Sequence, residues 1–186
     1  MKNYDVIVIG SGSANIVIDE AISHGKKCAL IEMGKFGGTC LTRSCIPNKV
    51  MVSVADFIRQ AKHVEKIGLK IHCIDVDFNL IKQRVEKKIN VESNEVYEYY
   101  ANQKNVDVYK ATAKFVSNKE IKIIYNDKSK GEEIITGQII VIGAEARTKI
   151  PKIEGMEEYS RLSAASKVFC PASAASTDVM RRPSTP

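Results

Sequence analysis

Two cysteines, Cys40 and Cys45, lie between a glycine pair, Gly37 and Gly38, and Pro47. In a regular helix an offset of five residues would separate their Cα atoms by about 8.7 Å, whereas a disulfide requires roughly 4.4 to 6.8 Å. If the two residues form a disulfide, the segment between them must therefore be a distorted turn. The glycines permit such a turn, and a proline is tolerated in the first turn of a helix, so we expect Cys45 at or near a helix N-terminus. That position favours the thiolate.

The other cysteines and the three histidines do not form a recognisable metal site. The chain has five cysteines, and no Cys-x-x-Cys or His pair accompanies Cys40 and Cys45. We expect Cys28, within an apolar run, to be an inert core thiol. An odd number of cysteines argues against a structural disulfide framework. We predict a redox-active pair and no metal, and a thiol-based metal or redox sensor is the minor alternative.

A second group of residues has the spacing of a dinucleotide site, Gly10-x-Gly12-x-x-Asn15. The glycines would let the turn, which includes Ser13, approach a pyrophosphate, and the following helix N-terminus would supply N–H groups. Glu32 ends the next apolar run about 20 residues further on, where a carboxylate can accept hydrogen bonds from ribose hydroxyls. Asn15 replaces the usual third glycine and carries a Cβ where helix and strand pack closely. We predict dinucleotide binding; the motif does not distinguish FAD from NAD, and an ordinary glycine-rich turn is the alternative.

The elements that must position these residues alternate at first between strand and helix. Apolar runs predict strands at residues 4–9 and 27–32, with a helix at 14–23 between them that stops at Gly25. Further helices are predicted at residues 50–66 and 78–102, the second capped by Asp77 or Asn79. Strands that form a small β-meander and a last core strand are predicted at residues 106–116, 120–125, 133–136 and 138–142. We predict an α/β fold, a Rossmann-like dinucleotide-binding domain with a parallel sheet, flanking helices and a β-meander.

The bulk composition of the 186 residues fits a globular protein. Net charge is +6, but lysines and glutamates are interspersed rather than clustered, so we predict no nucleic-acid partner. No apolar run approaches the roughly 20 residues of a membrane span, and the N-terminus enters a strand pattern directly. We therefore predict a cytoplasmic protein without a membrane partner.

The composition changes near residue 159. Residues 159–186 are rich in Ser, Ala and Thr and hold three of the five prolines. We predict a domain at residues 1–158 and a disordered tail at 159–186, with a foreign or out-of-frame extension as the alternative.

The segment Gly37-Gly38-Thr39-Cys40-x-x-x-x-Cys45-Ile46-Pro47-x-Lys49 resembles the active-site signature of the class I pyridine nucleotide-disulfide oxidoreductases. Members of that family include dihydrolipoamide dehydrogenase and the glutathione, mercuric and mycothione reductases. The resemblance covers about residues 1 to 158, the FAD-binding portion of the family. It implies an FAD-dependent thiol–disulfide oxidoreductase that is linked to NAD(P)H and acts on a small-molecule disulfide or dithiol, as a homodimer.

The resemblance also implies roles for single residues. Cys45 would be the thiol beside the flavin, and Cys40 the interchange thiol that attacks the substrate disulfide. Lys49 would approach the reactive nitrogen of the flavin, and Glu32 would hold the adenosine ribose. The other FAD-binding positions that it implies are Gly10, Gly12, Ser13, Asn15, Gly38, Thr39, Ala113, Gly143 and Ala144.

The sequence departs from the family pattern in two segments. Thr42-Arg43-Ser44 replaces Asn-Val-Gly, which places a charge inside the redox loop. Glu145 stands where a glycine normally lets the backbone approach FAD, so we expect a carboxylate there to weaken flavin binding by crowding and charge. Since no second glycine fingerprint occurs, we expect the NAD(P) and interface domains to be absent. The alternative function is therefore a catalytically incompetent FAD- or nucleotide-binding fragment.

Overall fold

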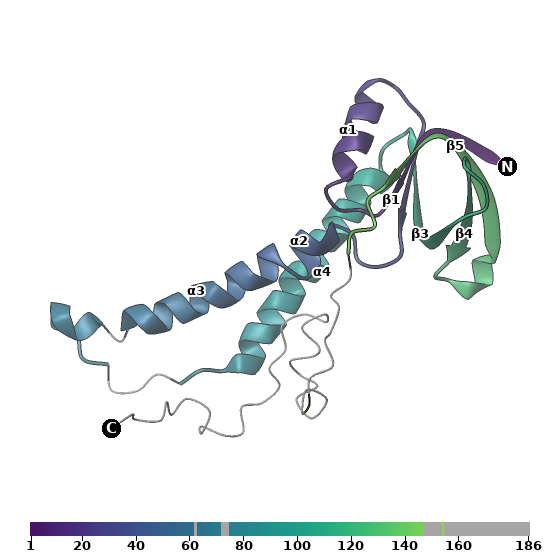
Figure 1. The fold of residues 1–186 in the computed structure, drawn as a ribbon. Helices are drawn as coiled ribbons and strands as arrows, with labels where there is room; N and C mark the ends of the chain where they lie inside the picture. Colours follow the sequence, from purple (N-terminus) through teal and green to yellow (C-terminus); the bar gives the residue numbers. More distant parts are fainter. Residues whose placement is uncertain (62, 72–74, 147–153, 155–186) are drawn as a thin grey trace.

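A computed structural model describes residues 1–61, 63–71, 75–146 and 154 of the protein (Figure 1). A βαβ unit opens the fold: β1 (Lys2–Ile9), α1 (Asn15–Ser23) and β2 (Cys28–Glu32), with β1 and β2 parallel. Gly25, with φ +68°, donates its N–H to Ile22 O at 2.9 Å and ends the turn after α1. The prediction for this part of the chain is confirmed, including the stop at Gly25.

The remaining strands are β3 (Val106–Phe115), β4 (Glu120–Tyr125) and β5 (Glu132–Ile142). They form one closed barrel with β1 and β2, in the order β1-β2-β3-β4-β5, because β5 returns to pair with β1. The pairs β1–β2, β1–β5 and β2–β3 are parallel, and β3–β4 and β4–β5 are antiparallel. The α/β class and the meander are as predicted, but the sheet is mixed rather than parallel.

The barrel closes because β3 and β5 each serve two neighbours. The first half of β3 pairs with β2, and its second half, from Ala111 on, pairs with β4. Likewise β5 begins against β4 and continues against β1. The two strands predicted at 133–136 and 138–142 are thus one strand. Gly137 lies inside it because a Cβ there would meet the Ile7 side chain at 2.7 Å.

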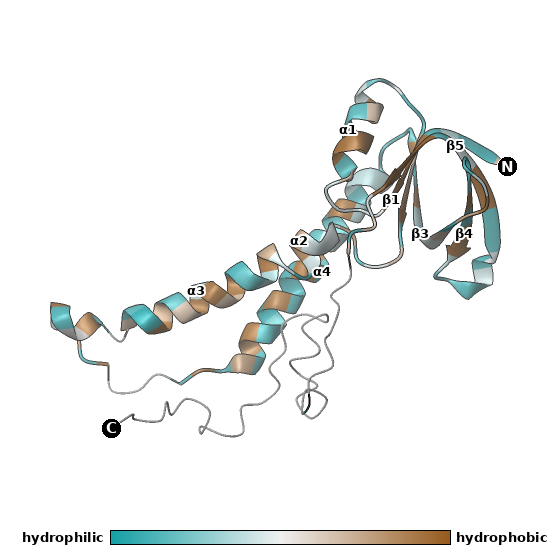
Figure 2. Ribbon diagram, viewed as in Figure 1, coloured by the Kyte–Doolittle hydropathy of each residue, from teal (hydrophilic) through white to brown (hydrophobic). Residues whose placement is uncertain are grey.

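Two apolar clusters fill the two faces of the strands. Ile7, Ala29 and Ile31 pack inside the barrel with Tyr109 and Ile121. Their neighbours along the chain point the other way: a second cluster joins the outer face of β1 and β2 to α1 and α4 and contains Val6, Val8, Ile18, Cys28, Leu30 and Tyr100. Because both faces of β1 and β2 are buried, their apolar runs are continuous in the sequence. These hydrophobic residues are brown in Figure 2. As predicted, Cys28 is a core thiol.

Four helical segments connect β2 to β3. They are α2 (Gly38–Thr42), α3 (Cys45–Ala61), the 3-10 turn η1 (Val64–Ile67) and α4 (Phe78–Ala101). The helix predicted at 50–66 therefore begins earlier and ends earlier, and α2 was not predicted. Asp77 caps α4 by accepting the Leu80 N–H at 2.9 Å, which decides between the two predicted caps. In Figure 1, α3 and the first half of α4 extend away from the barrel.

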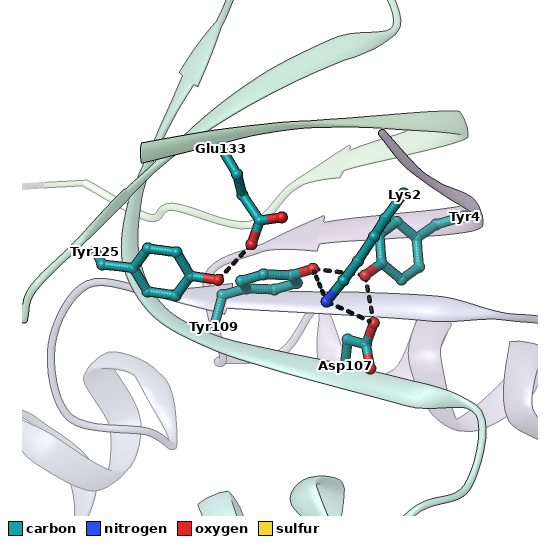
Figure 3. Close-up of polar contacts among 6 residues, drawn as sticks. All are labelled: Lys2, Tyr4, Asp107, Tyr109, Tyr125 and Glu133. Carbon is teal, nitrogen blue, oxygen red and sulfur yellow. Dashed lines mark hydrogen bonds and ion pairs between the residues drawn. The ribbon is translucent and has the colours of Figure 1, made fainter. Parts of the chain in front are cut away.

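Six polar residues of the strands form two hydrogen-bonded groups, one of Lys2, Tyr4, Asp107 and Tyr109 and the other of Tyr125 and Glu133 (Figure 3). Tyr4 and Tyr109 are buried, and their hydroxyls are 2.5 Å apart. The Tyr4 hydroxyl also bonds to Asp107, and Lys2 Nζ lies 3.3 Å from the Tyr109 hydroxyl. The Tyr125 hydroxyl donates to Glu133. Burial raises the pKa of Tyr4 and Tyr109, so both hydroxyls are neutral donors that satisfy the network.

The tail predicted at 159–186, and most of the end of the predicted domain after residue 146, lie outside the described residues. Among the helices that the structure describes, none combines the length and the apolar character needed to cross a membrane.

Candidate functional site

The turn after β1 is packed against the end of β5. Gly10 has φ +100°, and a Cβ there would lie 2.2 Å from the carbonyl oxygen of Gly143. A Cβ on Gly143 would in turn lie 2.4 Å from that of Ala14. The N–H of Gly10 donates to Ile31 O at 2.8 Å, and that of Gly143 donates to Ile9 O at 2.7 Å. The ends of three strands can meet this closely only because both positions are glycine.

Ser11 and Glu32 hold this turn in place. The Ser11 N–H and hydroxyl both donate to Glu32 Oε2, at 3.0 and 2.8 Å, and the Gly34 N–H donates to Oε1 at 2.7 Å. Ser11 is 1% exposed and also bonds to the Gly37 N–H through its carbonyl and hydroxyl oxygens, both at 3.1 Å. Sequence analysis missed Ser11, since a serine between two glycines carries no signal of a buried partner 21 residues away. A carboxylate has about four acceptor sites, so Glu32 retains capacity for a ligand.

A cavity of about 440 Å³ opens beside this turn, at the carboxyl ends of β1, β2 and β5. Ligands of open α/β sheets bind at such strand ends, and the volume is in the range of small-molecule sites. The predicted residues that line it are Gly10, Gly12, Glu32, Gly38, Ala113, Gly143 and Ala144. Sequence analysis did not assign two of its cationic residues, Lys35 and Arg43, to the site. Arg43 lies in the segment that departs from the family pattern.

Asn15 and Ser13 are not among the residues that line this cavity. The side-chain amide of Asn15 donates to the carbonyl oxygen of Ser11 at 3.1 Å, so it braces the glycine turn from behind. Its Oδ1 atom is buried without a hydrogen-bond partner among the described residues. Ser13 is exposed. The amide in place of a third glycine therefore positions the turn instead of crowding the cavity.

The second wall of the cavity is the glycine pair before α2. Gly38 has φ +65°, and a Cβ there would lie 2.4 Å from the Cα of Gly12. The Glu145 carboxylate lies between these segments: it accepts the Thr39 N–H at 2.8 Å and also the Thr39 hydroxyl. Glu145 has φ +58° and is the only non-glycine residue with positive φ in the described part of the chain. Thr39 therefore meets a carboxylate of its own chain at this wall.

The two cysteines lie on consecutive helices. Cys40 is within α2, and Cys45 is the first residue of α3. The chain bends between them: the N–H groups of Arg43 and Ser44 both donate to Thr39 O at 2.9 Å, and Arg43 leaves helical geometry with φ −139°. The segment between the cysteines is thus bent, as a disulfide between them would require, and Cys45 begins a helix, as Pro47 led us to expect. Cys40 and Cys45 are exposed free thiols.

The local contacts make the two thiols unequal. The interaction of the two thiols raises the pKa of Cys40 and lowers the pKa of Cys45. The Ser44 hydroxyl, 4.0 Å from Cys45 Sγ, lowers the pKa of Cys45 further, and so does the positive charge of Lys49 in the first turns of α3. Lys49 is exposed and is not among the cavity-lining residues, so its described effect is on the thiols. Cys45 is the thiol that ionises first.

The fold and this pairing of a glycine-lined cavity with a dithiol define a class of protein. Residues 4–179 match the family model described as pyridine nucleotide-disulphide oxidoreductase. The chain belongs to this family.

Several curated proteins of known name resemble the chain. The mycothione reductase of Mycobacterium tuberculosis (strain ATCC 25618 / H37Rv) is 32% identical over 81% of the chain, and the glutathione reductase of Schizosaccharomyces pombe is 33% identical over 76%. A solved structure of the flavoprotein disulfide reductase RclA from Escherichia coli, as a Cu(II) complex, superposes on 84% of the chain with a TM-score of 0.68 and 28% identity. The chain spans 32%, 31% and 32% of the lengths of these three proteins.

FAD is the cofactor that the family implies, and most of the cavity fits it. Gly10, Gly12 and Gly38 have no Cβ where backbone segments meet, which is the surface that a pyrophosphate needs. Glu32 lies at the end of β2 with free acceptor capacity, and Ala113 lines the cavity from β3. The exception is Glu145, an anion at the wall where another anion would bind.

Proposed function

We propose that the chain is the dithiol- and FAD-binding part of a flavoprotein thiol–disulfide oxidoreductase. The observation that carries this proposal is the placement of two exposed free thiols, Cys40 in α2 and Cys45 at the start of α3, on the segment whose Gly38 and Arg43 line the cavity. A pair with one readily formed thiolate and one neutral thiol suits thiol–disulfide exchange, since only the thiolate is a nucleophile.

In the proposed reaction, the reduced pair transfers two electrons to a small-molecule disulfide. Cys40, after giving its proton to the Cys45 thiolate, attacks one substrate sulfur and releases the other as a thiolate. Cys45, returned to its thiolate by loss of that proton to the leaving thiolate, then attacks Cys40 Sγ. The second substrate thiolate leaves, and a Cys40–Cys45 disulfide forms. The substrate is reduced to two thiols while the pair is oxidised.

We assign the cofactor site to the cavity residues and Thr39. Gly10, Gly12, Gly38 and Thr39 would hold the pyrophosphate, Glu32 the ribose, and Ala113 the adenine end. Ser13, Gly143 and Ala144 would contribute backbone, Asn15 would brace the turn, and Lys49 would approach the flavin. When bound, FAD supplies the electrons that return the disulfide to the dithiol. A pyridine nucleotide as the electron donor and a homodimer as the working assembly complete the proposal.

The test of the dithiol uses glutathione disulfide as a probe, with mass spectrometry as the readout. All variants carry Cys73→Ser and Cys170→Ser, so that Cys40 and Cys45 are the reactive thiols beside buried Cys28. The parent should release two glutathione molecules and lose two hydrogens. Cys45→Ser should retain one glutathione on Cys40, because the resolving thiol is gone. Cys40→Ser should react more slowly, with any adduct on Cys45.

The test of the cofactor site measures FAD binding by flavin fluorescence and absorbance. Gly38→Ala should weaken binding strongly, while Gly131→Ala, which also has positive φ but faces open space, should not. Binding without exchange at Cys40 would support the alternative, a nucleotide-binding module without turnover. A protein in which neither FAD binding nor ordered exchange occurs contradicts the proposal.

A further inference from the structure

Glu145 occupies the position that the cavity offers to an anion. Its carboxylate takes two hydrogen bonds from the Thr39 N–H, at 2.8 and 3.1 Å, and another from the Thr39 hydroxyl. These are the neutral donors with which a protein holds a phosphate oxygen. We propose that Glu145 determines the affinity of the cofactor site. Its carboxylate binds to the phosphate cradle, by which we mean the backbone of Gly12 and Gly38 together with Thr39, and a dinucleotide must displace this carboxylate before it can bind. This inference rests on the proposed function, since it takes the cavity to be the FAD site.

The distances indicate that the Glu145 carboxylate and a pyrophosphate cannot occupy the site at the same time, so one must replace the other. An added Cβ on Gly12 would lie 2.7 Å from Glu145 Oε1, and one on Gly38 would lie 2.9 Å from the same oxygen. The carboxylate therefore fills the space that these two glycines leave open. A pyrophosphate that approaches their backbone meets the carboxylate within contact distance, and the two anions repel each other. Glu145 must leave before the phosphate can bind to Thr39.

The backbone shows how it can leave. Glu145 has φ +58°, a left-handed conformation that glycine adopts freely and glutamate adopts at a cost. Glu145 is exposed, so its side chain can rotate into solvent when the hydrogen bonds to Thr39 break. Charge-assisted hydrogen bonds of this kind are strong enough that their loss should change ligand affinity by about ten- to a hundred-fold. Displacement is thus feasible, but it reduces the affinity for FAD.

The experiment compares the full chain with E145Q, E145G and a control, E98Q. The glutamine keeps the volume and removes the charge, whereas the glycine removes both and suits the positive φ. Glu98 is an exposed carboxylate on α4 that does not line the cavity, so E98Q changes the net charge equally. Affinities for FAD and for inorganic pyrophosphate are measured by titration calorimetry. The Thr39 amide resonance, followed by NMR, reports the loss of the carboxylate without any ligand.

We expect FAD and pyrophosphate to bind E145G about ten-fold or more tightly than the parent, with E145Q between them and E98Q equal to the parent. A shifted Thr39 amide in both Glu145 variants should accompany this. If FAD binds all four proteins equally, or binds the parent most tightly, the inference is overturned while the proposed cofactor site stands.

If no protein binds FAD but E145G gains pyrophosphate, competition between Glu145 and a phosphate for Thr39 is supported, and the assignment of the cavity to FAD is overturned. If no protein binds either probe, both are overturned.

Discussion

Replacement of Gly10 by alanine should destabilise the fold and abolish the cavity together. The new Cβ would lie 2.2 Å from Gly143 O and 2.7 Å from Gly143 C, which are backbone atoms that cannot rotate away. A left-handed alanine costs about 1–2 kcal/mol, and forced displacement of packed atoms costs about 1–3 kcal/mol. Loss of the hydrogen bond from Gly143 N to Ile9 O, now 2.7 Å, adds about 1 kcal/mol. We expect a total loss of about 3–6 kcal/mol in the free energy of unfolding.

Gly25→Ala is the matched control for this substitution. Gly25 also has positive φ, +68°, but a Cβ there would meet nothing within 4 Å. It should therefore show only the backbone term of about 1–2 kcal/mol. In urea denaturation followed by circular dichroism, the midpoint of Gly10→Ala should fall about 1–2 M further than that of Gly25→Ala. Equal midpoints for the two variants would refute the reasoning, because they would show that contact with Gly143 adds nothing.

Three further predictions concern the thiols, the buried serine and the tyrosines. Iodoacetamide should alkylate Cys45 at lower pH than Cys40, because the interaction of the two thiols lowers the pKa of Cys45 and raises that of Cys40; coincident pH profiles by mass spectrometry would contradict this. Ser11→Ala should lower the free energy of unfolding by about 1–3 kcal/mol because Glu32 loses a buried donor, whereas exposed Ser23→Ala should change it by less than about 0.5 kcal/mol in the same urea assay. Burial raises the pKa of four tyrosines, so the folded state resists their ionisation and the free energy of unfolding should fall as pH rises above about 10; constant stability from about pH 9 to about pH 11 would count against it. The four are Tyr4, Tyr100, Tyr109 and Tyr125.

The parts of the fold that sequence predicted are those whose signals are local. The run Tyr4-Asp5-Val6-Ile7-Val8-Ile9 indicates a strand buried on both faces, and Gly25 marks the end of the helix after it. Closure of the barrel is not local. It depends on β5 pairing with β1, where Lys2 lies opposite Ile135, and no periodicity within either strand encodes a partner that distant. The break predicted between the strands at 133–136 and 138–142 was wrong for the same reason, because Gly137 is needed to make room for the Ile7 side chain on another strand.

In the candidate site, too, the features with a local sequence signal were predicted, and those that depend on distant residues were not. A disulfide between Cys40 and Cys45 would require a bent segment, and the chain bends at Arg43. The short helix α2 escaped prediction because a glycine start and five residues give too little periodicity to detect. The bond from Ser11 to Glu32 and that from Thr39 to Glu145 join residues 21 and 106 positions apart. Only the folded chain reveals them.

Helix α2 connects the two halves of the proposed chemistry. Its first residue, Gly38, forms a wall of the phosphate cradle, its second, Thr39, binds Glu145, and its third is Cys40. The carbonyl oxygen of Thr39 also accepts the two N–H groups that shape the bend before Cys45. Thr39 therefore contacts the cavity through its N–H and the dithiol segment through its carbonyl. Whatever anion binds to Thr39, the chain's own carboxylate or a pyrophosphate, is held by the same peptide segment that sets the geometry between the two cysteines.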